Sequence, residues 1–232
     1  MMGGSVANFV LVHGAWGGAW VWDETAEAIR AAGHRVHALD LTGLGARGHL
    51  GGLGVNLTTH ITDVTETLTA HRLSEVILVG HSYGGMVITG AADRAAERVA
   101  ALVYLDAFLP RDGDSLLSLG TEHSRAWILA SAQRGGGFVE RLPRTDSFAS
   151  EARYRAQSLG CFAEGIRLSG AYQGIRRRSY IRAIGYDPSP FAAPHAACVA
   201  DPGWRTATIG TGHTTMLEDP IGTARLLLEA GG

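Results

Sequence analysis

A serine enclosed by glycines, directly after an apolar and mostly β-branched segment, constrains this chain more than any other feature. The segment is Val76 to Val79, and the chain continues Gly80-His81-Ser82-Tyr83-Gly84. In a sharp turn from strand to helix, a side chain at position 80 or 84 would collide with neighbouring backbone, which gives both glycines a steric reason. The alternative is an ordinary tight loop with a solvated serine. Because a strand pattern precedes the motif and a helix pattern follows it, the context favours a nucleophile elbow at Ser82.

Short apolar runs alternate with amphipathic helical patterns along most of the chain. The predicted strands cover residues 8–13, 34–40, 75–82, 99–107, 179–186 and 204–210, and the predicted helices cover 20–32, 57–72, 84–97 and 219–230. Strands that are apolar on both faces and separated by helices favour a parallel sheet covered on both sides. At 232 residues and 46% hydrophobic content, the chain is long enough for one substantial core. We therefore predict an α/β fold with a mostly parallel sheet of six or more strands.

The alternation stops between about residues 110 and 178. This stretch contains Pro110 and Gly135-Gly136-Gly137, and it has helical patches around 115–133 and 150–172. An insertion at the catalytic ends of the strands forms a lid that excludes water and shapes a pocket. A segment that only decorates one edge of the sheet is the alternative. We predict a core of residues 1–109 and 179–232, with residues 110–178 as the lid.

Charge and composition disfavour several classes of partner and cofactor. The chain has 20 basic and 22 acidic residues, a net charge of −2, which gathers neither nucleic acid nor an anionic membrane. Its only basic run, Arg176-Arg177-Arg178, lacks a glycine-rich phosphate loop and interleaved aromatic residues. No histidine pair has a metal-binding helical spacing, and Cys161 and Cys198 fit no metal or redox motif. We therefore expect no metal and no cofactor.

The N-terminal apolar segment bears on location. Residues Phe9 to Val12 are too few for a signal sequence, and no segment approaches membrane-spanning length. We expect a cytoplasmic enzyme whose partner is a small-molecule substrate, with no nucleic-acid or membrane partner. Assembly as a homodimer stays open.

A serine hydroxyl needs a base to take its proton, and His213 is the best candidate. It lies in Gly210-Thr211-Gly212-His213, a loop that follows the last predicted strand. In a sheet of this order, that loop carries the last member of a catalytic triad. His81 is expected to point to the other side of the elbow, and His195 is expected to be exposed in a loop rich in proline and alanine.

The base in turn needs an acid that fixes its tautomer, and two residues compete for this role. Asp106 ends an apolar strand, where a carboxylate is costly unless it is paired. Asp187 follows the next core strand, but Asp187-Pro188-Ser189-Pro190 is also a common turn sequence in which the aspartate caps its own backbone. We prefer Asp106 and keep Asp187 as the alternative acid.

Two backbone N–H groups must hold the negative charge that develops on the substrate oxygen. The N–H of Tyr83, directly after the serine, supplies the first. The second is expected from Ala15, in the loop His13-Gly14-Ala15-Trp16 after the first strand. A simple strand-ending turn is the alternative for His13-Gly14, but in a doubly wound sheet this loop must pass near the elbow.

Three segments together carry a resemblance to a known family. They are residues 9–20, with Val12-His13-Gly14-Ala15-Trp16; residues 33–41, with Gly33-His34-Arg35-Val36; and residues 80–86, with Gly80-His81-Ser82-Tyr83-Gly84-Gly85-Met86. This pattern resembles the α/β-hydrolase superfamily, in particular the branch of plant methyl esterases, hydroxynitrile lyases and bacterial esterase relatives. The resemblance covers about residues 1–109 and 179–232. It implies Ser82 as nucleophile, His213 as base, and Ala15 and Tyr83 as oxyanion donors.

The chain also departs from this family pattern at two points. The family's usual acid follows the strand that corresponds to residues 180–186, but the register of Asp187 differs by about one residue, whereas Asp106 resembles the acid position of dehalogenase-like and some lactone-cleaving relatives. The lyase branch has a lysine after the catalytic histidine and a threonine after the first strand's histidine. Here these positions are Thr214 and Gly14, which disfavours a cyanohydrin lyase.

The sequence therefore predicts a serine hydrolase that cleaves a carboxylic ester or lactone of a small, mostly apolar molecule through an acyl-enzyme. A non-hydrolytic enzyme on the same scaffold, such as a lyase, cyclase or isomerase, is one alternative, and a ligand-binding module with a vestigial triad is another. The candidate pocket residues are aromatic or aliphatic, although such residues are also common in cores: Trp16, Trp20, Phe108, Leu109, Trp127 and Tyr172.

Overall fold

A six-stranded parallel sheet forms the centre of the protein. The computed structural model describes residues 6–143, 151–186 and 189–232. Within these residues the strand order is β2-β1-β3-β4-β7-β8, and every neighbouring pair is parallel. The strands are β1 (Asn8–Val12), β2 (Arg35–Leu39), β3 (Val76–His81), β4 (Val99–Leu105), β7 (Arg177–Ala183) and β8 (Arg205–Ile209). The predicted α/β fold and its parallel sheet are confirmed.

Burial along the strands follows their place in the sheet. All six residues of β3 are buried, and so are all residues of β4 except Ala100, because these strands lie in the interior with helices on both faces. The edge strands β2 and β8 each bury only their last residue, Leu39 and Ile209. Continuous apolar sequence therefore marks the centre of the sheet, where the elbow follows β3.

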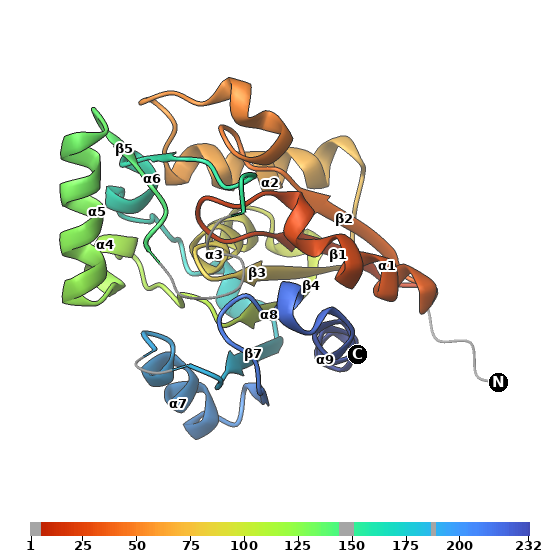
Figure 1. Cartoon of the computed structure of the whole chain (residues 1–232). Coiled ribbons are helices and arrows are strands. Elements are labelled where there is room, and N and C mark those ends of the chain that lie inside the picture. The colour runs from red at the N-terminus through yellow and green to blue at the C-terminus, as the bar shows by residue number, and fades with distance from the viewer. Residues whose placement is uncertain (1–5, 144–150, 187–188) are drawn as a thin grey trace.

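Helices cover the two faces of the sheet as two separate layers (Figure 1). Helices α1 (Asp23–Ala31) and α9 (Pro220–Gly231) pack together on one face. Helices α2 (Leu57–Ala70) and α3 (Gly84–Arg94) pack together on the other face. The four predicted core helices are thus all present.

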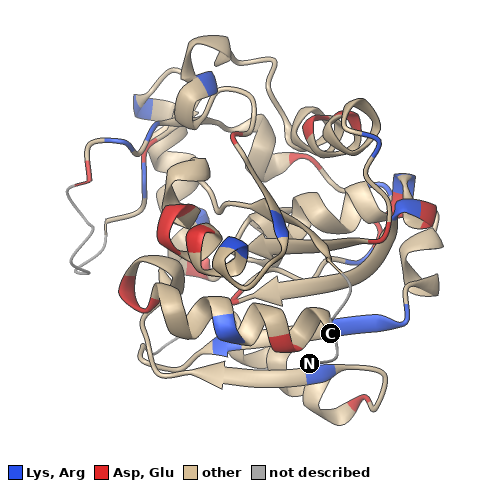
Figure 2. Cartoon of the chain, turned by 90° about the vertical axis from the view of Figure 1, so that its right-hand side faces the viewer, with Lys and Arg blue, Asp and Glu red and all other residues tan. Residues whose placement is uncertain are grey.

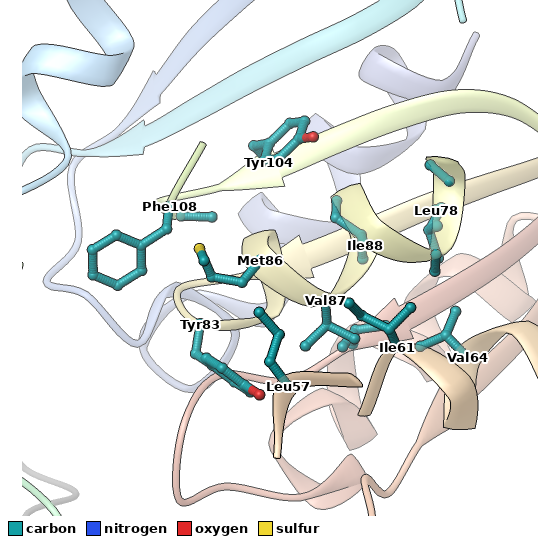
Figure 3. Close-up of a cluster of buried hydrophobic side chains, with 14 of the residues drawn as sticks. Leu57, Ile61, Val64, Leu78, Tyr83, Met86, Val87, Ile88, Tyr104 and Phe108 are labelled. Atoms are coloured by element: carbon teal, nitrogen blue, oxygen red, sulfur yellow. The ribbon is translucent and has the colours of Figure 1, made fainter. Parts of the chain in front are cut away.

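The core on the α2–α3 face closes directly around the elbow. Figure 3 shows Leu57 and Ile61 of α2 beside Val87 of α3, with Tyr83 and Met86 at the start of that helix. All of these side chains are at most 3% exposed. The turn at Ser82 is therefore built against a packed layer, which restricts its movement.

Between β4 and β7 the chain leaves the sheet and forms short elements. These are α4 (Leu116–Leu119), α5 (Glu122–Arg134), β5 (Phe138–Val139), β6 (Gln157–Ser158), α6 (Gly160–Ala163) and the 3-10 turn η4 (Ala171–Gly174). Strands β5 and β6 pair antiparallel. In Figure 1 the elements α4 to α6 lie together on one side of the sheet, coloured green to teal. The boundaries of the lid at residues 110 and 178 stay a prediction.

Two sequence-based expectations in this region need correction. The helical patch predicted around 150–172 is mostly irregular, with β6, α6 and part of η4 as its only regular elements among the described residues. Gly160, Gly165 and Gly170 interrupt it, and glycine is a poor helix former. Conversely, the loop that contains His195 is helix α7 (Ala192–Ala200), with Pro194 in its first turn, where its missing N–H costs nothing.

The remaining regular elements are short and join the layers. They are η1 (Ala19–Trp22), η2 (Gly45–Leu50), η3 (Ala96–Arg98) and α8 (Thr215–Glu218). Basic and acidic residues are interspersed on the side shown in Figure 2. None of the helices in the described ranges combines bilayer-spanning length with a sufficiently apolar sequence.

Candidate active site

The Ser82 turn is a strained connection between β3 and α3. Ser82 has a φ of 55°, in the left-handed region that residues with a side chain rarely adopt. A Cβ atom on Gly80 would lie 2.6 Å from the Gly84 carbonyl oxygen, and a Cβ atom on Gly84 would lie 2.7 Å from the Val12 carbonyl oxygen. Both glycines are therefore required for the close backbone contacts of the elbow. The serine itself is partly exposed between buried neighbours.

Ser82, His213 and Asp106 come together at the carboxyl ends of the strands. The Ser82 hydroxyl lies 3.0 Å from Nε2 of His213. Nδ1 of the same ring lies 2.6 Å from Oδ2 of Asp106. An Nδ1–H that donates to the carboxylate leaves Nε2 free to accept the serine proton, which is the tautomer that general-base catalysis needs. The three residues predicted from the sequence thus have the geometry of a nucleophile, base and acid.

Asp106 is fully buried and held from several sides. Its backbone lies in the left-handed region with a φ of 43°, and its N–H donates to the Ile181 carbonyl at 2.7 Å. Oδ1 accepts the Ala183 N–H at 3.1 Å, and Oδ2 accepts the Tyr186 hydroxyl at 2.6 Å as well as His213. A carboxylate with this many donors is stable without solvent. The alternative acid, Asp187, lies outside the described residues.

Tyr186 is a member of this site that the sequence reasoning missed. Its hydroxyl lies 2.6 Å from Oδ2 of Asp106 and 3.3 Å from Nδ1 of His213, and it accepts the Ser189 hydroxyl at 3.0 Å. The residue follows β7, beside the position at which the family pattern places its acid. A tyrosine has no motif spacing that signals this role, so only the folded arrangement identifies it.

The loop of His213 is held by His81 and Phe191. His81 Nε2–H donates to the His213 carbonyl at 2.9 Å, and the two imidazole rings lie 4.5 Å apart. The Phe191 ring is stacked on His213 with centroids 5.2 Å apart. His81 therefore contacts the loop of His213, rather than pointing to the other side of the elbow as we expected. His195 lies on α7, only partly exposed and with its ring against Tyr180, so it is not the exposed loop residue that we expected.

The loop after β1 passes directly beside the serine. A Cβ atom on Gly14 would lie 3.0 Å from the Ser82 Cβ, so the loop approaches as closely as glycine permits. Within the described residues, neither the Ala15 N–H nor the Tyr83 N–H donates to a protein acceptor. Two unpaired backbone donors beside a nucleophile are the arrangement that an oxyanion hole requires.

Two buried histidines form hydrogen bonds with the residues that carry or precede these donors. His13 Nδ1–H donates to the Gly14 carbonyl at 2.7 Å, and its Nε2 accepts the Leu41 N–H at 3.2 Å. His60 Nε2–H donates to the Thr42 carbonyl at 2.9 Å, and its Nδ1 accepts the Tyr83 hydroxyl at 2.9 Å. Burial lowers the pKa of His13, and burial likewise lowers the pKa of His60 to about 4. Both rings are thus neutral at pH 7, and each donates a hydrogen bond from one nitrogen and accepts one at the other.

Trp16 connects this loop to the segment between β4 and β7. Its backbone N–H donates to the Gln157 side-chain oxygen at 2.9 Å, and its carbonyl accepts the Arg155 N–H at 2.9 Å. Its indole N–H donates to the Val139 carbonyl at 2.9 Å, and its ring is stacked on Phe162. The prediction that Trp16 lines a pocket did not anticipate these contacts.

The other predicted pocket residues lie in different surroundings. Phe108 packs against Phe191, next to the base. Leu109 lines a cavity of about 340 Å³ together with Tyr172. Trp127 of α5 is partly exposed and packs against Arg134, with its indole N–H donating to the Glu140 carbonyl.

Trp20 lies beneath the Arg153 guanidinium and against Tyr154. Whether any of these residues contacts a substrate stays a prediction. In the described part of the chain, no cluster of three or more His, Cys, Asp or Glu side chains is arranged to hold a metal ion.

Comparison with known proteins relates this site to characterised enzymes. A model of the "Alpha/beta hydrolase family" matches residues 9–226. The chain is 42% identical to a carbendazim hydrolyzing esterase of Nocardioides sp. (strain SG-4G), over 97% of this chain and 100% of that protein. It is 35% identical to Methylesterase 1 of Arabidopsis thaliana, over 53% of this chain and 44% of that protein.

A solved structure is similar along nearly its whole length. It is an extracellular alpha/beta-hydrolase from a Paenibacillus species, with a TM-score of 0.85 and 24% identity, and the match covers 97% of this chain and 99% of that one. At this identity the likeness supports the fold alone. The expected resemblance to plant methyl esterases and bacterial esterases is confirmed by the sequence relatives.

Proposed function

The chain belongs to the alpha/beta hydrolase family, and on this premise we propose that it is a serine hydrolase of carboxylic esters that works through an acyl-enzyme. The chain of contacts from Ser82 through His213 to Asp106 carries this proposal. The identity of 42% with an esterase, over almost the full length of both proteins, supports ester hydrolysis as the reaction.

The geometry accommodates each proton transfer of ester hydrolysis. His213 Nε2, at 3.0 Å, takes the Ser82 proton as the hydroxyl oxygen attacks the ester carbonyl. The positive charge that the imidazole gains is stabilised by Asp106 at Nδ1. The imidazolium then returns the proton to the leaving alkoxide. A water molecule repeats the sequence on the acyl-enzyme and releases the acid.

The developing oxyanion needs donors that are already oriented when the charge forms. We assign this role to the N–H groups of Ala15 and Tyr83, which lie on either side of the elbow. In enzymes of this kind, removal of one such donor lowers kcat by about 100- to 1000-fold. The small side chain of Ala15 leaves room for a substrate carbonyl.

The substrate class follows from the site and from the relatives. We propose an ester or lactone of a small, mostly apolar molecule, because Phe108 and Phe191 pack next to the base. The esterase relative hydrolyses carbendazim, so this compound is the first to test. Lactone cleavage, a cytoplasmic location and a homodimeric state stay predictions from the sequence.

A fluorophosphonate probe followed by product analysis tests this function. A serine hydrolase becomes labelled at Ser82, which peptide mass spectrometry locates, and it incorporates ¹⁸O from labelled water into the released acid. A ligand-binding module with a vestigial triad leaves the probe unreacted. A lyase, cyclase or isomerase on this scaffold converts its substrate without incorporating water oxygen.

A further inference from the structure

The loop that carries the proposed oxyanion donor Ala15 is completed by residues from a distant part of the chain. Trp16, the next residue, has a φ of 64°, which is unfavourable for a residue with a large side chain. Such a conformation persists only where the surroundings impose it. The contacts of Trp16 therefore indicate what holds this loop in place.

These contacts come from the small antiparallel pair β5–β6. Val139 and Gln157 lie opposite each other in that pair. The Val139 carbonyl accepts the Trp16 indole N–H at 2.9 Å, and the Gln157 side-chain oxygen accepts the Trp16 backbone N–H at 2.9 Å. Both partners are buried, with exposures of 0% and 3%. Strand β6 thus supplies an acceptor for a backbone group in the oxyanion loop.

Gln157 is otherwise an unfavourable residue at this place. Its Nε2 is buried with no oxygen or nitrogen acceptor among the described residues, and the Cys161 thiol, a weak acceptor, is its neighbour. A buried amide group without a strong acceptor is unfavourable, so an apolar residue of similar size would be better for packing alone. The Oε1 bond to Trp16 is the feature that a glutamine provides and an apolar residue does not.

The two peptide planes on either side of Ala15 are thus each fixed by a hydrogen bond to a side chain, from a different partner. His13 donates to the Gly14 carbonyl, which shares its peptide plane with the Ala15 N–H. Gln157 holds the N–H of the following plane, between Ala15 and Trp16. His13 belongs to the core next to β1, whereas Gln157 belongs to the segment between β4 and β7.

We infer that Gln157 is a positioning residue that orients the Ala15 N–H for oxyanion binding. This inference rests on the proposed function. Oxyanion donors act only when the residues around them hold them in a fixed orientation. By this inference the β5–β6 pair contributes to the catalytic geometry as well as covering the core.

Three variants separate this role from general stability. Gln157→Met removes the acceptor at similar length, and Gln157→Glu keeps an oxygen at the same place. Ser158→Ala is the matched control in the same strand, because the Ser158 hydroxyl is buried but donates to the Leu53 carbonyl and does not touch Trp16. The readouts are kcat and KM for 4-nitrophenyl acetate, the second-order rate of fluorophosphonate labelling, and Tm.

We expect Gln157→Met to lower kcat and the labelling rate by about 10- to 100-fold, less than the loss of a whole oxyanion donor, with KM changed by less than about twofold. Gln157→Glu recovers most of the rate, and Ser158→Ala stays within about twofold of the wild type. If Gln157→Met fails to fold, Gln157→Leu, which also lacks the acceptor for the Trp16 N–H, replaces it and should lower the labelling rate in the same way.

The inference is overturned if Gln157→Met labels at the wild-type rate, if Gln157→Glu is as slow as Gln157→Met, or if Ser158→Ala loses as much activity. With Gln157→Leu as the substitute, labelling at the wild-type rate overturns it too. These outcomes leave the proposed function intact as long as the wild type is labelled at Ser82. A wild-type protein that the probe does not label contradicts the proposed function, and this inference with it.

Discussion

The Tyr186 hydroxyl donates a 2.6 Å hydrogen bond to Oδ2 of Asp106, the same oxygen that contacts His213. The Ser189 hydroxyl in turn donates to the tyrosine oxygen at 3.0 Å. Tyrosine and histidine thus share one carboxylate oxygen, and the other oxygen is taken by the Ala183 N–H. The orientation of the acid is fixed by groups from β7 and the chain that follows it.

Tyr186→Phe removes this hydroxyl and keeps the ring. A hydrogen bond to a charged group contributes about 1.5 to 3 kcal/mol, so we expect kcat to fall by about 10- to 100-fold. KM should stay nearly constant, because the Tyr186 hydroxyl contacts Asp106 and His213. Steady-state kinetics on an activated ester measures this split. Ser189→Ala, which removes only the outer bond, serves as the comparison and should lose less. An equal fall for both variants would contradict a direct role of Tyr186.

Asp106→Asn tests the choice between the two candidate acids. An amide in place of the carboxylate favours the wrong tautomer of His213, and kcat should fall by about ten-thousandfold. Asp187→Asn should leave kcat within the same order of magnitude. A large loss for Asp187→Asn together with a small one for Asp106→Asn would reverse the assignment.

Ser82→Ala removes the nucleophile. Because the three residues act as a unit, turnover of an activated ester should fall by about a millionfold, to the rate that binding and the oxyanion donors alone support. The rate of product release from the activated ester, followed by absorbance with freshly purified protein, measures this decrease in turnover. Retention of most of the activity would exclude the acyl-enzyme mechanism.

Asp93→Asn concerns stability rather than chemistry. Partial burial opposes ionisation of this carboxyl, but hydrogen bonds from the backbone N–H groups of Ser169, Tyr172 and Gly170 outweigh it and lower the pKa of Asp93 below 3.8. A lowered pKa in the folded state means that ionised Asp93 stabilises the fold at pH values above the ordinary aspartate pKa. This contribution is lost as the pH falls through the folded-state pKa.

The variant should therefore have a lower Tm than the wild type at pH 7. The difference should shrink below about pH 4, where the ordinary aspartate pKa lies. Differential scanning calorimetry across pH 3 to 7 measures this difference, with about the same buffer strength throughout. A difference in Tm that grows on acidification would contradict the role of Asp93.

Features that depend on a local residue pattern could be predicted from the sequence. Glycines 80 and 84 have steric reasons that belong to the elbow itself, so the turn at Ser82 was readable from adjacent residues. His213 was found because a loop after the last strand of a parallel sheet must end at the same edge as the elbow. Asp106 was preferred because a carboxylate at the end of a buried strand needs partners, and the structure supplies them.

Features that depend on contacts between segments far apart in the sequence could not be predicted from it. Gln157 meets Trp16 across 141 positions, and Tyr186 meets Asp106 across 80 positions. Neither residue type marks its partner by spacing. Helix α7 was not predicted because proline and alanine are also common in loops. The prediction of helix around 150–172 is wrong because Gly165 and Gly170 interrupt the apolar pattern.

Ser82 and Asp106 directly follow the neighbouring strands of a single strand–helix–strand unit, formed by β3, α3 and β4. During synthesis from the N-terminus, two of the three proposed catalytic groups therefore leave the ribosome well before His213. We therefore expect no ester hydrolysis from a nascent chain until β8 and the loop after it are in place, since that loop brings the His213 imidazole to the Ser82 hydroxyl.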